Sequence, residues 1–298
     1  MGITIKTKSE LAIMREAGRI TCGAIWYAGE KLRAGMSTLD VDKLVGEYYA
    51  KHGCKSCFKG LYGFPANACI SVNEEIIHGI PKASHRLKEG DIVSIDTGAA
   101  YKGFNGDSCW TFPVGKISDE AKALLEVTKQ SLYEGIAQAQ VGARIGDISH
   151  AVEEYCASRG YGIVRNYCGH GIGREVHESP EIPNWGRAGH GPRLVAGMTI
   201  CIEPMINVKG DDVKTLKDGW TVVTKSGSLS AHFEHAIAIT PDGPVILTEQ
   251  FCGKCRCGAY TGGNAENCCG GSRARLRRGL CRHRHRRKPR VYSRRQKP

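Results

Sequence analysis

The segment from residue 95 to residue 112, IDTGAAYKGFNGDSCWTF, contains two aspartates in a sequence that otherwise favours β-strands. Asp is a poor strand former, and a buried carboxylate without a partner is costly. Glycines near the middle suit a tight turn, so we expect an antiparallel hairpin centred between Tyr101 and Lys102. In this register Asp96 and Asp107 lie directly opposite each other, with Cβ atoms roughly 4.5–5.5 Å apart.

Two like charges at this distance repel each other, and burial strengthens the repulsion. A proton, a basic side chain or a metal cation would relieve it. The one basic residue in the segment is Lys102, at the tip of the predicted turn. The hairpin therefore either lies at a solvated edge of a sheet or uses its two aspartates to hold a cation.

Three further residues of metal-ligand type occur later in the chain. Glu203 in MTICIEP and Glu234 in AHFEHAIAIT are acids within apolar strand patterns, and glycines on both sides of His170 leave its imidazole accessible. Four carboxylates and one imidazole suit Mn, Fe(II), Co or Zn, and two divalent cations neutralise four carboxylates. Such paired ions lie about 3.5–4 Å apart and stabilise a hydrolytic transition state. His235 is expected to face the other side of its strand.

An internal repeat predicts how these regions come together. Residues 33–54 match residues 140–161 at an offset of 107, so that a helix pattern and the residues at both of its ends recur. The same offset places the strand-like GDIVSID on GMTICIE, so that Asp96 falls on Glu203. One offset that fits two separate elements predicts two similar α+β halves that share a cleft. A chance match between two amphipathic helices is the alternative.

Periodicity and capping signals predict the elements that position these residues. We expect helices over residues 7–32, 39–52 and 118–140, and strands over 68–73 and 90–98. The first helix opens at Thr7, which has capping-box spacing to Glu10.

Composition narrows the class of protein. The chain has 298 residues and 41% apolar residues, enough for one large or two ordinary domains. It contains no apolar run close to 18 residues, its start lacks the apolar stretch of a secretory signal, and Lys6 argues against myristoylation, so we expect a cytoplasmic protein. Residues 271–298 carry 13 basic residues and no acid, so the net charge of +12 comes from this tail. Eight scattered cysteines in residues 1–250 are expected to be reduced thiols.

The sequence resembles the type I, bacterial-like methionine aminopeptidases of peptidase family M24A over about residues 4–250. The motifs that carry the resemblance are HGIP (78–81), DIVSIDTG (91–98), GFNGDSCWTF (103–112), GHGIGREVHESP (169–180), MTICIEP (198–204) and DGWTVVTKSGSLSAHFEHAIAIT (218–240). The resemblance implies the pseudo-two-fold "pita-bread" (creatinase/aminopeptidase) fold, an α+β fold with a central antiparallel sheet and outer helices. Its two similar α/β halves would cover about residues 1–115 and 116–250.

The resemblance also implies a role for each metal ligand. Asp107 and Glu234 would bridge two divalent ions (Co, Mn, Fe(II) or Zn), Asp96 would complete one site, and His170 with Glu203 would complete the other. A water or hydroxide between the ions would be the nucleophile, with Glu203 as the general base.

Two histidines and an apolar pocket would bind the substrate in such an enzyme. His177 would donate a hydrogen bond to the developing oxyanion or the peptide bond, and His78 would contact the peptide near the scissile nitrogen. The methionine pocket would be formed by Phe58, Leu61, Phe64, Cys69 and Trp220. Without the resemblance, His78 would be interpreted as a turn residue, and the pocket aromatics would be interpreted as residues of the hydrophobic core. Because His177 follows His170 by seven residues, the chain must bend between them, and Gly171 and Gly173 permit this.

The implied activity is removal of the initiator methionine from nascent proteins, favouring a small second residue, by a cytoplasmic and monomeric enzyme. Proline-specific relatives carry a large N-terminal domain, for which residues 1–40 are too short. Type II relatives carry an insertion between the positions of His177 and Glu203, which here are close in sequence. A non-catalytic protein of this fold that binds RNA or protein partners is the rival interpretation, but such relatives generally lose metal ligands.

The C-terminal segment has two predicted parts. Residues 251–272 are Cys-rich, and four thiols resemble the small SEC-C-type zinc motif: Cys255, Cys257, Cys268 and Cys269. Residues 273–298 are basic and predicted to be disordered, with a charge that suits ribosomal RNA. The alternatives are free thiols without zinc, and unselected sequence that resembles an out-of-frame reading.

Overall fold

The computed structural model describes residues 2–249, and the expectations for residues 251–298 lie outside this part of the chain. Its helices are α1 (Lys8–Gly29), α2 (Thr38–Lys51), α3 (Asp119–Ala137) and α4 (Ile145–Ala157), with a short 3₁₀ helix η1 (Leu61–Gly63). The three predicted helices are confirmed, but α1 and α3 each end three residues before the predicted positions Leu32 and Gln140. None of the described helices is both long and apolar enough to cross a membrane.

Side-chain caps fix where the first two helices begin. The Thr7 hydroxyl accepts a hydrogen bond from the Glu10 backbone N–H, and the Glu10 carboxylate accepts one from the Thr7 N–H. Ser37 and Asp40 form the same reciprocal pair at the start of α2. Each capping box satisfies backbone donors that the helix leaves unpaired.

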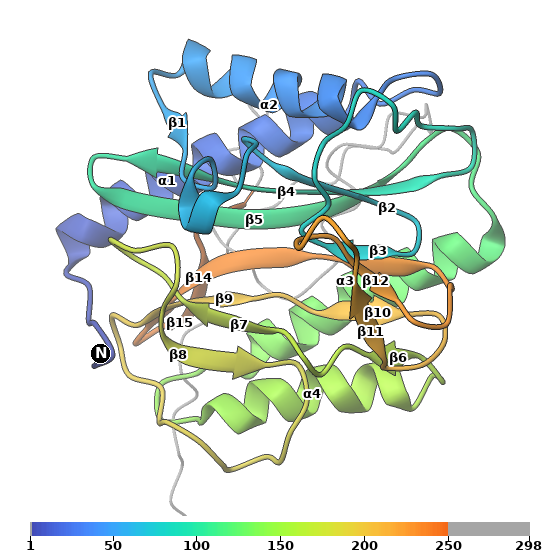
Figure 1. Cartoon of the computed structure of the whole chain (residues 1–298). Helices are drawn as coiled ribbons and strands as arrows, with labels where there is room; N and C mark the ends of the chain where they lie inside the picture. Colours follow the sequence, from blue (N-terminus) through green and yellow to red (C-terminus); the bar gives the residue numbers. More distant parts are fainter. Residues whose placement is uncertain (1, 250–298) are drawn as a thin grey trace, which may run out of the picture. The chain divides into compact units, whose positions relative to one another are not determined.

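The central element is a nine-stranded antiparallel sheet among the described residues (Figure 1). Its strands are β1 (Lys55–Ser56), β2 (Cys69–Val72), β4 (Ile92–Tyr101), β5 (Phe104–Pro113), β7 (Cys168–Gly171), β8 (Glu178–Pro183), β9 (Thr199–Ile202), β14 (Glu234–Thr240) and β15 (Gly243–Ile246). The spatial order is β1-β4-β5-β14-β9-β7-β8, with β2 paired to β4 and β15 to β14. The predicted strands at 68–73 and 90–98 are therefore confirmed.

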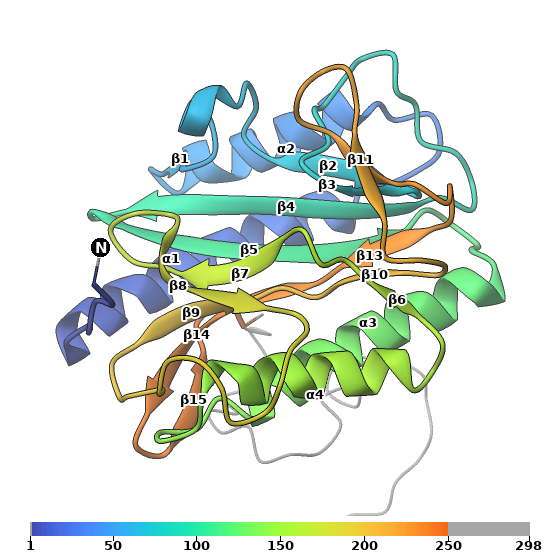
Figure 2. The same ribbon diagram turned by 60° about the horizontal axis from the view of Figure 1, so that its bottom comes forward.

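Two three-stranded sheets accompany the central one. The first contains β3 (Glu75–Ile77), β11 (Val213–Thr215) and β12 (Val222–Thr224), and the second contains β6 (Gly162–Ile163), β10 (Met205–Asn207) and β13 (Ser230–His232). Helix α1 packs on β4 and β5, and α2 packs on α1 and beside β1 and β2. On the other side of the molecule, α3 lies beside β9 and β14, and α4 packs on α3 and beside β6 and β8 (Figures 1 and 2).

Each pair of helices closes a separate hydrophobic core. Val41 and Val45 of α2 pack in one cluster with Ile95 of β4, and Leu124 and Ile148 of α3 and α4 pack in another cluster. The approach of α1 to the hairpin is close, because a Cβ at Gly106 would lie 2.7 Å from the backbone of α1. Only glycine fits there, which explains one of the glycines of the GFNGD segment.

The two halves repeat the same backbone contacts at the offset of 107. The Gly35 N–H donates to the Leu87 carbonyl at 2.8 Å, and the Gly142 N–H donates to the Leu194 carbonyl at 2.9 Å. Gly35 and Gly142 both have a left-handed backbone, with φ of 88° and 92°. Isolated bridges at the helix starts also correspond: Ser37 to Arg86, and Arg144 to Arg193. The predicted fold of two similar α/β halves is confirmed.

The predicted register of the β4–β5 hairpin is wrong by one residue at the turn. The turn residues are Lys102 and Gly103, both with positive φ (48° and 78°), which is the backbone of a two-residue type I′ turn. Asp96 is consequently opposite Cys109, and Asp107 is opposite Gly98. The two aspartates still share one face of the sheet, but they are diagonal neighbours, a separation of roughly 7–8 Å or somewhat less between Cβ atoms.

Candidate metal centre

One transverse row of paired residues crosses four strands of the central sheet. Cys69 of β2 pairs with Asp96 of β4, Asp96 pairs with Cys109 of β5, and Cys109 pairs with Glu234 of β14. Directly paired residues of antiparallel strands point to the same face. Asp96 and Glu234 therefore lie on one face of the sheet, although they are far apart in the sequence.

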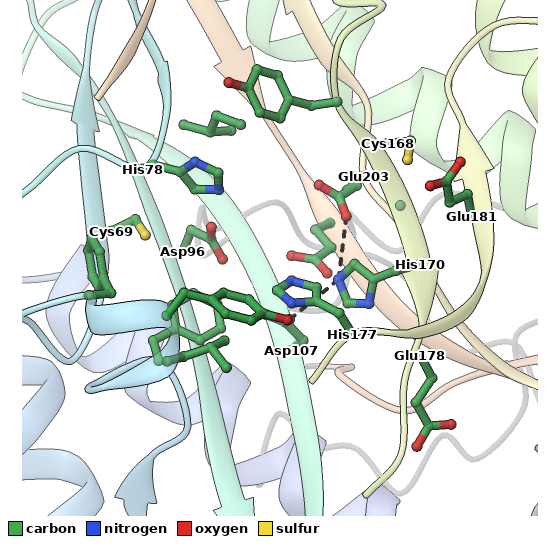
Figure 3. Close-up of a pocket in the computed structure, with 18 of the residues that line it drawn as sticks. Cys69, His78, Asp96, Asp107, Cys168, His170, His177, Glu178, Glu181 and Glu203 are labelled. Atoms are coloured by element: carbon green, nitrogen blue, oxygen red, sulfur yellow. Dashed lines mark ion pairs between the residues drawn. The ribbon is translucent and has the colours of Figure 1, made fainter. Parts of the chain in front are cut away.

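A second row lies next to the first. Asp107 of β5 is two residues from Cys109, and continuing the β5–β14 register places it beside Ala236, which pairs with Cys201 of β9. Continuing the β7–β9 register places His170 beside Cys201. Glu203 directly follows β9. The sheet thus brings all five predicted ligands to one floor, where Figure 3 shows Asp96, Asp107, His170 and Glu203 facing the same space.

Distances within this floor are short enough for ionic contact. His170 Nε2 lies 3.7 Å from Asp107 Oδ2 and 3.6 Å from Glu203 Oε1 (Figure 3). The other ring nitrogen, His170 Nδ1, lies 2.9 Å from the Gly171 carbonyl oxygen, so it carries the proton. This bond orients the ring and leaves the Nε2 lone pair facing the carboxylates, the arrangement usual for a metal-binding imidazole.

Burial perturbs the acidity of every carboxyl on the floor. It raises the pKa of Asp96 to about 7. Burial, followed by the charges of Glu234 and Asp96, raises the pKa of Asp107 well above its usual value. Burial and then nearby carboxylates do the same to the pKa of Glu203 and of Glu234. When one of these four acids is ionised, its charge disfavours ionisation of the others.

The donor set fits divalent cations. Asp96 Oδ1, Asp107 Oδ1 and Glu234 Oε1 are buried and have no hydrogen-bond partner among the described residues. Buried carboxylate oxygens of this kind are costly unless a cation or a donor satisfies them. Oxygen donors with one imidazole suit divalent transition-metal cations, so the structure agrees with a divalent metal site at this floor.

Two more histidines approach the floor from above. The imidazole rings of His170 and His177 form a T-shaped contact with their centroids 4.4 Å apart, so the chain does bend between these residues. Gly171 in this bend is required by lack of space and not by its backbone angles. A Cβ there would lie 2.3 Å from the Ser179 carbonyl oxygen. His78 faces the floor from the loop after β3, as Figure 3 shows. Burial lowers the pKa of His78 to about 4 and also lowers the pKa of His177.

All twelve predicted site residues of the body line one cavity of about 550 Å³. Its apolar wall is formed by Phe58, Leu61, Phe64, Cys69 and Trp220. Phe64 and Trp220 meet edge to face with ring centroids 5.1 Å apart. The polar floor and this apolar wall therefore belong to a single pocket. His235, as expected, faces away from it and bonds Thr248 through Nδ1 at 2.9 Å.

Sequence reasoning missed three residues of this pocket region. His232 is buried with Nε2 at 3.7 Å from Glu203 Oε2, and the period-2 pattern that joins it to Glu234 is a signal that could have found it. Tyr62, at the pocket mouth, stacks on His177 with ring centroids 5.8 Å apart. Tyr167 contacts His78 edge to face at 5.8 Å. No local sequence pattern distinguishes these two tyrosines from ordinary surface or core residues.

Comparison with known proteins agrees with this geometry. Residues 12–241 match the model of metallopeptidase family M24. The chain is 51% identical over 246 residues to a methionine aminopeptidase of Clostridium perfringens, covering 83% of this chain and 98% of the relative. It is 50% identical to methionine aminopeptidase 1 of Bacillus subtilis, covering 83% and 99%. The crystal structure of a Thermotoga maritima methionine aminopeptidase superposes with a TM-score of 0.82 at 44% identity, covering 84% and 100%. The chain belongs to the methionine aminopeptidases of metallopeptidase family M24.

Proposed function

We propose that this chain is a metal-dependent hydrolase that removes the initiator methionine from nascent proteins, favouring a small second residue. The observation that supports the proposal best is the convergence of three buried carboxylates, the largely buried Glu203 and one imidazole at the floor of a cavity with an apolar wall. Such a floor is suited to hydrolysis, and such a wall is suited to an unbranched apolar side chain.

The five floor residues would hold two divalent ions of the group Co, Mn, Fe(II) and Zn. Asp107 and Glu234 would be shared between the ions, Asp96 would complete one site, and His170 with Glu203 would complete the other. When bound, the ions supply Lewis-acid activation of water and of the scissile carbonyl. The same carboxylates would attract the free α-amine of the substrate, which restricts cleavage to the chain end.

Glu203 is the residue best placed to move a proton. Its side chain is 12% exposed, and its two oxygens lie near different imidazoles, His170 at 3.6 Å and His232 at 3.7 Å. Burial and neighbouring carboxylates raise its pKa well above the usual value. A carboxylate with a raised pKa is a stronger base, so Glu203 accepts a proton from the attacking water and delivers it to the leaving amine.

His177 and His78 act as neutral hydrogen-bond donors. Burial lowers the pKa of both, so near pH 7 each ring is uncharged and carries one N–H. His177 donates to the oxygen on which negative charge develops, and His78 contacts the peptide near the scissile nitrogen. A donor aimed at a developing oxyanion stabilises the transition state more than the ground state.

The apolar wall would accept the methionine side chain. Phe58, Phe64 and Cys69 are buried, and Leu61 and Trp220 pack against them. A thioether makes favourable contacts with aromatic rings, and its unbranched stem fills an irregular apolar space. The wall therefore selects methionine by shape and polarisability rather than by hydrogen bonds.

Peptide hydrolysis tests this proposal directly. Metal-free protein, supplied with Co(II), Mn(II), Fe(II) or Zn(II), is expected to release methionine from Met-Gly and Met-Ala peptides. Asp107→Asn is expected to abolish the release, because it removes a carboxylate shared between both ions. Folded protein that releases no methionine with any of these ions would refute the enzyme and favour a binding protein of the same fold.

The C-terminal segment suggests where the enzyme works. We infer that residues 1–250 form the catalytic unit of a cytoplasmic monomer, that residues 251–272 bind zinc through Cys255, Cys257, Cys268 and Cys269, and that residues 273–298 dock on ribosomal RNA. The concentration of 13 basic residues after residue 270 supports docking. Deleting residues 251–298 is expected to abolish co-sedimentation with ribosomes, and unchanged co-sedimentation would contradict the docking.

A further inference from the structure

A fully buried thiol lies among the floor residues. Cys201 is on β9, two residues before Glu203, so both side chains face the floor. Its sulfur belongs to a compact group with one donor atom each from Asp107, His170 and Glu234, and these four atoms lie within 4.8 Å of one another. The metal-centre roles inferred above give Cys201 no function.

The spacing of this group is that of ligands to one ion. Metal–ligand bonds of about 2.0–2.3 Å place the ligands of a four-coordinate ion roughly 3–4 Å apart, so a small contraction closes the group around a cation. Asp107 Oδ1 and Glu234 Oε1 are both buried and lack a hydrogen-bond partner among the described residues. These oxygens point independently to a missing cation at the same place.

Comparison with another thiol of the same face shows that Cys201 is distinct. Cys109 is equally buried, but its S–H donates to the His232 carbonyl oxygen at 3.5 Å, and its sulfur is outside the four-donor group. The Cys201 sulfur instead lies within 4.8 Å of a carboxylate oxygen of Glu234.

We propose that Cys201 is a direct ligand of the ion held by Asp107, His170 and Glu234, which gives one of the two metal sites a sulfur donor. On binding, the S–H bond breaks, the sulfur–metal bond forms, and the proton is released to the solvent. A thiolate donor favours Zn(II), Co(II) and Fe(II) over Mn(II), so Cys201 tunes the metal preference of the centre. The inference rests on the metal site of the proposed function and goes beyond it in naming the ligand.

Cobalt spectroscopy on the full chain tests the sulfur ligand without measuring activity. Enough Co(II) to fill both sites of the body and the Cys-rich segment, added to metal-free reduced protein, is expected to produce a near-ultraviolet thiolate-to-cobalt charge-transfer band. Cys201→Ser is expected to lose the part of this band that comes from residues 1–250, whereas Cys109→Ser is expected to retain it. The cysteines after residue 250 are present in all three proteins, so the difference spectrum reports the body alone. Calorimetry is expected to show that Cys201→Ser weakens Co(II) and Zn(II) binding at least about tenfold and Mn(II) binding less.

The outcomes separate this inference from the proposed function. Identical charge-transfer bands in wild type and Cys201→Ser, with Co(II) bound and methionine released, would overturn the sulfur ligand and leave the enzyme standing. A wild-type body that binds no Co(II) would overturn both. Cys201→Thr serves as a second variant, since threonine favours strands and has no thiol, and circular dichroism verifies that each variant is folded. Loss of the band in either folded variant supports the ligand.

Discussion

The two halves of the molecule share a backbone frame but present different chemistry to the cavity. Equivalent glycines, bridges and helix starts recur at an offset of 107, and Asp96 in one half corresponds to Glu203 in the other. The first half gives the floor two carboxylates from one continuous hairpin. The second half gives an imidazole and two carboxylates from three separate strand regions, and also the loop that carries His177.

This difference shows which parts of a repeated fold are free to diverge. The recurring positions are those that the backbone requires, such as the left-handed turns at Gly35 and Gly142. Side chains on the inner face of the sheet have no such backbone requirement, so each half can supply a different kind of donor. The first half thus supplies two carboxylates and the His78 donor, while the second adds the imidazole of His170, the proposed base Glu203 and the second donor, His177.

Exchanging the matched carboxylates one at a time tests this division of labour, and it should give the largest effect. Glu203→Gln is expected to lower kcat by about a thousandfold or more, because it removes both a proton acceptor and a ligand. Asp96→Asn removes a ligand alone, so its activity should recover in part at high metal concentration. Methionine release measured against metal concentration distinguishes the two. Equal losses at saturating metal would show that Glu203 has no special role as a base.

A buried ion pair fixes the catalytic loop of the second half and has no equivalent contact at the corresponding place of the first. Lys6 Nζ lies 2.6 Å from Glu178 Oε2, and Glu178 Oε1 accepts the Arg174 backbone N–H at 2.8 Å. Lys6→Met is expected to lower the free energy of unfolding by roughly 1.5–3 kcal/mol, the contribution of a hydrogen bond to a charged group. Urea unfolding measures this, and KM should rise because His177 adjoins Glu178.

Glu16→Gln is the matched control for this ion pair. Glu16 pairs with Arg19 at 2.7 Å on an exposed part of α1, with 39% of each side chain accessible. Its loss is expected to change stability by less than about 0.5 kcal/mol. If Lys6→Met changed the free energy of unfolding as little as this control, the contact of Lys6 with Glu178 would not stabilise the loop that carries His177.

Much of this architecture could be predicted from sequence because it depends on local rules. Helix starts follow from capping residues such as Thr7, and the four candidate carboxylate ligands are unusual residue types within apolar strands. The hairpin register was missed because it depends on a positive φ at Lys102, a conformation that residues other than glycine seldom adopt. A one-residue shift of the turn changes every cross-strand partner.

The positions of His232 and Cys201 beside the candidate ligands were not predicted, because they depend on the pairing of strands that are distant in the sequence. Cys201 reaches the cluster through the pairing of β9 with β14 and β7, and His232 reaches Glu203 through the pairing of β13 with β10. These contacts join segments about 30 residues apart or more, so no window of sequence contains the whole arrangement. Residue type alone pointed to the candidate ligands, but only the sheet register identified their neighbours.

The pH dependence of metal binding separates the acids of the first half from the imidazole of the second. The pKa of Asp96 is raised to about 7, so this carboxyl is largely protonated at pH 6 and largely ionised at pH 8. The pKa of His170 is lowered to about 4, so it stays neutral over this range. Affinity for Mn(II) is therefore expected to rise at least about tenfold from pH 6 to pH 8, because at low pH the ion must displace a proton.

Calorimetry in buffers of different ionisation enthalpy counts the protons released by this binding. Wild type should release more protons at pH 6 than at pH 8, and Asp96→Asn should release fewer than wild type at pH 6. An affinity that is the same at both pH values would show that the carboxyls of the floor are already ionised before the metal binds.

The smallest expected effect compares the starts of the two equivalent helices. The Ser37 hydroxyl accepts the Asp40 N–H at 3.1 Å, whereas Arg144, the corresponding residue of the second half, has no side-chain acceptor. Ser37→Ala is expected to cost about 1 kcal/mol of unfolding free energy, and Arg144→Ala less than about 0.5 kcal/mol. Both are expected to leave methionine release unchanged, since neither residue lines the cavity. Equal losses would mean that the Asp40 and Asp147 carboxylates, which accept the N–H of Ser37 and Arg144, carry the cap in both halves.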